Sequence, residues 1–161
     1  MATATYVPLA TQTLGSNASS ITFSSIPSGY TDLKIRIVAL SSTAPANIAY
    51  QFNGDTGTNY SNTYVFGNGS SALSGSIASN SNLQTDYGSH LSITTPQTVL
   101  IDIFSYTGSS YKTTLATLSA DYNGSGSVVS LVGLWRSTAA ITSVVLTAPF
   151  ATGTTATLWG I

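Results

Sequence analysis

The amino-acid sequence predicts an all-β protein, an antiparallel β-sandwich of about eight to ten strands, with a jelly roll as the preferred arrangement. Two observations carry this prediction. Helix-forming patterns are nearly absent, because Glu is missing and Ser, Thr and Gly interrupt every stretch long enough for a helix. Short segments of alternating polar and apolar residues recur instead, with turn-forming residues between them at intervals of about 8–15 residues.

The clearest alternation lies in the first third of the chain. In segment 32–37, polar and apolar residues alternate, which places Leu33, Ile35 and Ile37 on one face of a strand. Segment 48–52 alternates in the same way. We therefore expect each of these segments to bury one face in the sandwich.

Segment 99–104 is more continuously apolar. We expect its Val99, Ile101 and Ile103 to face the core and Asp102 to lie on the opposite face. The other candidate strands are 5–9, 20–23, 60–66, 90–93, 112–120, 128–135, 141–146 and 156–159.

Turn-forming residues separate these segments. The dipeptide Asn-Gly occurs at 53–54, 68–69 and 123–124, and both of its residues tolerate a positive φ. The stretch 67–84 has weak periodicity, and we predict either a long loop or a pair of frayed edge strands there.

The amino-acid composition argues against several classes of function. The 161 residues suffice for one domain with a sizeable core, so we treat 1–161 as a single domain with an extended contact arm at 1–14. A net charge of -1 with four dispersed cations gives no basic surface for nucleic acid. No Cys and one His argue against disulfides and metal sites, and we predict no cofactor. We expect no membrane insertion and no signal peptide.

Charged residues make up only 6% of the chain, whereas 26 Ser and 25 Thr supply small hydroxyl groups. Segments 128–135, 141–146 and 156–159 carry apolar residues on both faces. A second apolar face needs a second burial partner, so we expect a homo-oligomer, a closed ring with large interfaces. The alternative is a monomer coated with hydroxyl groups.

Catalytic signals are weak. Nothing in the sequence brings two of the five carboxylates together as a glycosidase acid–base pair. His90 is the one imidazole, and no Gly-x-Ser-x-Gly elbow accompanies it. We predict that the chain is not an enzyme. The five carboxylates are Asp32, Asp55, Asp86, Asp102 and Asp121.

The segment NGDTGTN, which begins at Asn53, has oxygen-bearing side chains at alternating positions, loosely like a calcium loop. It lacks the terminal acidic residue of a strong calcium loop, so a structural turn is the preferred interpretation. In that turn, we expect Gly54 and Gly57 to adopt positive φ. We expect the side chains of Asp55 and Asn59 to hydrogen-bond to nearby backbone amides.

Three tyrosines, Tyr60, Tyr64 and Tyr87, lie near predicted loops. Their rings suit stacking on sugar rings, which makes them candidate glycan contacts. The same residues suit an oligomer interface or a sheet surface, and that alternative stays open.

Three segments carry a family resemblance: 30–37 (YTDLKIRI), 52–61 (FNGDTGTNYS) and 155–161 (TATLWGI). They resemble small virion proteins of tailed bacteriophages, including those of cyanobacterial and other marine phages. Segment 52–61 is the most specific of the three. The likeness runs in order from 20 to 161, and Trp159 stands where the similar proteins usually have Tyr.

The resemblance implies a β-sandwich module of a virus particle, assembled in the host cytoplasm and localised in the virion. We expect a capsid decoration, or cement, protein that binds the major capsid protein, forms a homotrimer and stabilises the particle. The first alternative is a tail fibre, spike or receptor-binding protein that recognises a host surface polysaccharide. A carbohydrate-binding module or adhesin of cellular origin and an enzyme are further alternatives.

Overall fold

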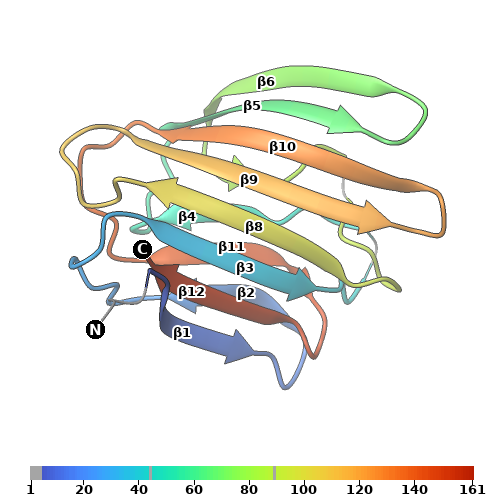
Figure 1. Ribbon diagram of the computed structural model, residues 1–161, viewed down its shortest axis with the longest axis horizontal. Coiled ribbons are helices and arrows are strands. Elements are labelled where there is room, and N and C mark those ends of the chain that lie inside the picture. Colours follow the sequence, from blue (N-terminus) through green and yellow to red (C-terminus); the bar gives the residue numbers. More distant parts are fainter. Residues whose placement is uncertain (1–4, 44, 89) are drawn as a thin grey trace.

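The computed structural model describes residues 5–43, 45–88 and 90–161, and within them the chain forms twelve strands in two antiparallel sheets. Figure 1 shows the larger sheet lying over the smaller one. The arrangement is a β-sandwich, which confirms the predicted fold class. A jelly roll is not confirmed, because one sheet holds eight strands and the other four.

The larger sheet has eight hydrogen-bonded strands, and the N-terminal strand lies at one of its edges. Its strands lie in the order β1 (Val7–Thr13), β12 (Thr155–Gly160), β3 (Leu33–Ala39), β8 (Gln97–Phe104), β9 (Lys112–Asp121), β10 (Gly126–Trp135), β5 (Tyr60–Gly67) and β6 (Ala72–Asn80). The smaller sheet has the order β2 (Ala18–Phe23), β11 (Val144–Phe150), β4 (Ala49–Phe52) and β7 (Leu83–Gln84).

The core lies between the two sheets and follows the predicted alternation. The apolar face of β3 is fully buried, and so is that of β8, whose Asp102 lies on the opposite face as expected. Branched side chains on these strands favour the pleated, half-buried surface that they occupy. The buried residues of the two strands are Leu33, Ile35, Ile37, Val99, Ile101 and Ile103.

The smaller sheet covers only part of the larger one. Beyond it, residues 85–88 and 90–96 lie on the inner face of β5, where two of their rings stack on β5 side chains. The ring of Tyr87 stacks on Tyr64, and the imidazole of His90 stacks on Phe66. A loop therefore completes the core where the four-stranded sheet ends.

Several predicted elements differ from the structure. Segment 90–93 is not a strand, because Leu91 makes a single isolated bridge to Ala46. The stretch 67–84 contains β6 and the two-residue β7, which agrees with edge strands and not with a long loop. Residues 7–13 of the predicted contact arm form edge strand β1, paired with β12, and residues 1–4 lie outside the described residues.

The Asn-Gly dipeptides mark chain reversals as predicted. The pair at 123–124 connects β9 to β10 with φ values of 66° and 89°, and the pair at 68–69 lies between β5 and β6, with φ of 86° at Gly69. These positive values match the conformation that Asn and Gly tolerate best.

Candidate functional site

The predicted structural turn joins β4 of the smaller sheet to β5 of the larger one. Gly54 has a φ of 69°, as predicted, and Asn53 has a φ of 53°. Gly57 lies outside the positive-φ region, so that part of the prediction is wrong. Space explains Gly57 instead, because a Cβ there would lie 2.9 Å from Nδ2 of Asn59 and 3.1 Å from Oδ1 of Asp55.

The side chain of Asn53 fastens this turn to the loop between β10 and β11. Its Oδ1 accepts hydrogen bonds from the amides of Thr142 and Ser143 at 2.8 and 3.1 Å. Its Nδ2 donates to the carbonyl of Ala140 at 2.8 Å. The side chain of Asn53 thus gives backbone groups of this loop the hydrogen-bond partners that a neighbouring strand would otherwise supply.

The carboxylate of Asp55 gathers three donors. It accepts from the amide of Gly57, as predicted, and from Nε1 of Trp135 at 2.7 Å. The prediction for Asn59 is wrong, because its Nδ2 donates to this carboxylate at 2.9 Å and not to a backbone group. The Trp135 hydrogen bond is the main cause that lowers the pKa of Asp55. Because N–H donors already surround the Asp55 carboxylate, the arrangement favours a structural turn over a calcium loop.

The candidate glycan contacts are mostly buried. Tyr60 is fully buried, and its hydroxyl donates to the carbonyl of Asp55 and accepts from the amide of Phe52, both at 3.1 Å. Burial raises the pKa of Tyr60 to about 12. Tyr64 is nearly buried beneath Tyr87, with ring centroids 4.5 Å apart. A glycan role is therefore wrong for Tyr60 and Tyr64, and Tyr87, 47% exposed, stays a candidate.

A second polar cluster consists of Asp86, His90 and Tyr122. Oδ2 of the buried Asp86 accepts from the amide of His90 at 2.8 Å and lies 3.0 Å from its Nδ1. The hydroxyl of Tyr122 donates to the carbonyl of His90. Burial is the main cause that raises the pKa of Asp86, against the opposing contacts from His90.

Two further carboxylates accept hydrogen bonds from backbone amides. Asp32 accepts from the amide of Ser105 at 2.6 Å, and Asp121 accepts from the amide of Gly124 at 3.0 Å. Within the described ranges, no group of three or more His and Asp side chains is placed to hold a metal ion. The part of the chain that the structure describes also contains no helix able to span a membrane.

Two of the four cations are held by backbone carbonyls. Nζ of the fully buried Lys112 lies 2.6 Å from the carbonyl oxygens of Gly108 and Ser110 and 3.4 Å from that of Thr138. A guanidinium nitrogen of Arg136 donates to the carbonyl of Thr58. These contacts fix loops at the end of the sheet where β9 begins and β10 ends.

The outward face of the larger sheet is divided into two halves. Over β9, β10, β5 and β6, the outward residues carry no charge apart from Asp121 at the end of β9. Three valines on this half are exposed: Val128 at 69%, and Val65 and Val132 at 53% each. We call this half the valine face.

The other half of the outward face carries charge. Nζ of Lys34 on β3 lies 2.7 Å from Oδ1 of Asp102 on β8. Lys34, Tyr6, Arg36, Leu100 and Trp159 line an open depression of about 300 Å³ across β12, β3 and β8. We call it the Trp159 depression.

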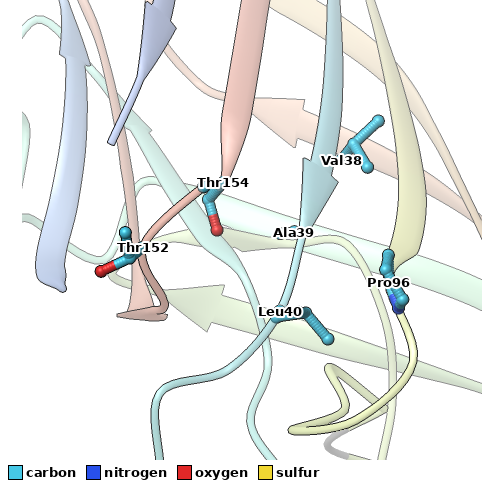
Figure 2. A pocket seen from close by; sticks show the side chains of 7 residues that line it. Val38, Ala39, Leu40, Pro96, Thr152 and Thr154 are labelled. Atoms are coloured by element: carbon cyan, nitrogen blue, oxygen red, sulfur yellow. The ribbon is translucent and has the colours of Figure 1, made fainter. Parts of the chain in front are cut away.

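A smaller hollow of about 170 Å³ lies at the ends of β3 and β8 (Figure 2). Val38, Leu40 and Pro96 line one side, and Thr152 and Thr154 of the turn before β12 line the other. Its lining has no charged or imidazole group, so it offers no acid–base chemistry.

The fold and these surfaces define a β-sandwich with an uncharged outward sheet face beside a charged, aromatic depression. No protein-family model matches the chain, and no curated protein or solved structure matches it either.

Proposed function

We propose that the chain is a structural component of a virus particle, a capsid decoration protein that binds copies of itself and the capsid surface. The valine face is the observation that carries this proposal. Burying the exposed apolar surface of these valines stabilises an assembly by about 25 cal/mol per Å², and uncharged surroundings avoid the larger cost of burying charges. The sequence resemblance to phage virion proteins supports the same function.

Self-association is tested on the purified full chain by light scattering after size-exclusion chromatography. We expect a homotrimer for the wild type and a monomer for Val132→Asp, with melting temperatures that differ little because Val132 is exposed. Ile93→Asp is the matched control, since Ile93 is also 53% exposed and lies outside the valine face. A wild type that stays monomeric at micromolar concentration would contradict the proposed assembly.

Location on the particle is tested by immunogold electron microscopy of the source virus. We expect label over the head, because a decoration protein is present in many copies on the capsid lattice. Label confined to the tail would overturn the decoration function. It would support instead a tail fibre or receptor-binding protein, a second candidate that the Trp159 depression favours.

A further inference from the structure

The Trp159 depression combines aromatic and cationic side chains in one open site. Tyr6 is 51% exposed just before β1, and Trp159 is half-buried on β12. Trp159 pairs across the strands with Pro8 on β1 and with Lys34 on β3. The depression has a volume of about 300 Å³, at the lower end of the range for ligand pockets, which suits a single sugar residue.

Arg36 is the exposed cation of this site. Lys34 is paired with Asp102, whereas Arg36 has no hydrogen-bond or ion-pair partner among the described residues. Arg36 lies opposite Leu100 on β8 and diagonally across from Trp159 on β12. Diagonal neighbours in a sheet are about 7–8 Å apart, within the reach of one small ligand.

The balance of charge selects the kind of ligand. Asp102 offsets Lys34, so the site keeps one uncompensated positive charge, on Arg36. The planar guanidinium donates two parallel hydrogen bonds to a carboxylate, and this geometry distinguishes Arg from Lys. An aromatic face beside it suits the C–H face of a sugar ring, and Lys34 offers a donor to sugar hydroxyls.

We propose that the Trp159 depression binds a carboxylate-bearing sugar, such as a uronic acid residue of a surface polysaccharide. Arg36 holds the carboxylate, and Trp159 and Tyr6 contact the ring. This site differs from the tyrosines expected from the sequence, and it does not involve the valine face. Its test is therefore independent of the test of assembly.

The test uses the full chain and NMR titration with galacturonic acid, galactose and acetate. The chain has two tryptophans, and Trp135 is buried and does not line the Trp159 depression. We expect galacturonic acid to shift the indole N–H signal of Trp159 and not that of Trp135. Galactose lacks the carboxylate and acetate lacks the ring, so both are expected to bind at least about tenfold more weakly.

Variants with matched controls identify the residues. Arg36→Ala is expected to weaken galacturonic acid binding about tenfold or more, whereas Arg136→Ala leaves it unchanged. Tyr6→Ala is expected to weaken it, whereas Tyr111→Ala, which removes a ring that is 54% exposed elsewhere, does not.

Three results would overturn the proposal. The first is no shift of the Trp159 signal with galacturonic acid in the millimolar range. The second is equal binding of galactose or of acetate, which would mean that only a ring or only an anion is recognised. The third is unchanged affinity in Arg36→Ala with its spectrum otherwise intact.

Discussion

The indole Nε1–H of Trp135 donates a hydrogen bond to Oδ2 of Asp55 at 2.7 Å, although the two residues are 80 positions apart. Trp135 ends β10 of the larger sheet, and Asp55 follows β4 of the smaller one. The Trp135 ring also lies against Phe52 and stacks on Tyr60, with centroid distances of 5.5 and 6.3 Å. One carboxylate therefore links a surface turn to the aromatic side chains at this end of the core.

The first prediction concerns the contribution of this carboxylate to stability. Asp55→Ala removes the acceptor of three N–H groups and leaves the indole N–H of Trp135 without it. We expect a loss of about 1–3 kcal/mol in the free energy of unfolding. A protein of this size loses about 2–4 °C in melting temperature per kcal/mol, which differential scanning calorimetry resolves.

Asp121→Ala is the matched control for this experiment. Asp121 accepts one hydrogen bond, from the amide of Gly124, in an exposed hairpin. We expect a smaller loss there, about 0.5–1 kcal/mol. Equal melting temperatures for Asp55→Ala and the wild type would show that the turn does not contribute to stability in this way.

The second prediction is the pH dependence that Asp55 confers. Its pKa in the folded chain lies below its unfolded value, chiefly because Trp135 donates to the ionised form. The folded state therefore binds its proton less readily, and this stabilisation is complete above the unfolded pKa. It is lost as pH falls through the folded pKa.

Urea denaturation from neutral to acid pH tests this sign. The stability difference between the wild type and Asp55→Asn is expected to be largest near neutral pH and to shrink in acid. A difference that stays constant with pH would contradict the assigned cause.

Local patterns in the sequence predict the strand faces and the hairpins. Leu33, Ile35 and Ile37 are buried because alternation with period two leaves one face for the core. The Asn-Gly turns are predictable because positive φ at 123–124 is a local steric property. Neither inference needs knowledge of what lies across the core.

Tertiary contacts are the part that local patterns miss. Tyr60 lies near a predicted loop in the sequence, yet it is buried, because the preceding turn and the distant Trp135 enclose its ring. Segment 90–93 has the composition of a strand, but the amide of His90 bonds to Asp86 instead of to a neighbouring strand. The Trp159 depression draws side chains from separate strands, and no spacing in the sequence brings Arg36 beside Trp159.

The third prediction concerns Asp86, whose pKa shift on folding has the opposite sign to that of Asp55. Burial raises its pKa in the folded state, despite the contacts from His90. A raised carboxyl pKa contributes stability below the unfolded pKa, and that contribution is lost as pH rises through the folded pKa. His90 is the titratable group that hydrogen-bonds to Asp86, and the charge of Asp86 in turn contributes to raising the pKa of Tyr122.

Denaturation curves of Asp86→Asn measure this effect. Asparagine keeps an acceptor for the amide of His90 but does not ionise. We expect the variant to lose less stability than the wild type as pH rises above about 4, the unfolded carboxyl pKa. Parallel pH profiles for the two proteins would refute the assignment.

The fourth prediction concerns Lys112, the buried cation. Its Nζ contacts the carbonyl oxygens of Gly108, Ser110 and Thr138, so it ties the loop before β9 to the loop after β10. Burial lowers its pKa, because desolvation disfavours the charged form. Lys112→Met fills a similar volume but leaves those carbonyls without this donor.

We expect Lys112→Met to lower the free energy of unfolding by about 1–3 kcal/mol, because three carbonyl acceptors lose a charged donor. The same substitution at Lys34 breaks only a half-exposed ion pair with Asp102 and is expected to cost about 0–1 kcal/mol. Hydrogen exchange separates the causes, since the amides of 108–111 are expected to exchange faster in Lys112→Met alone. If the two variants lose equal stability and exchange alike, the carbonyl contacts of Lys112 do not hold the two loops together.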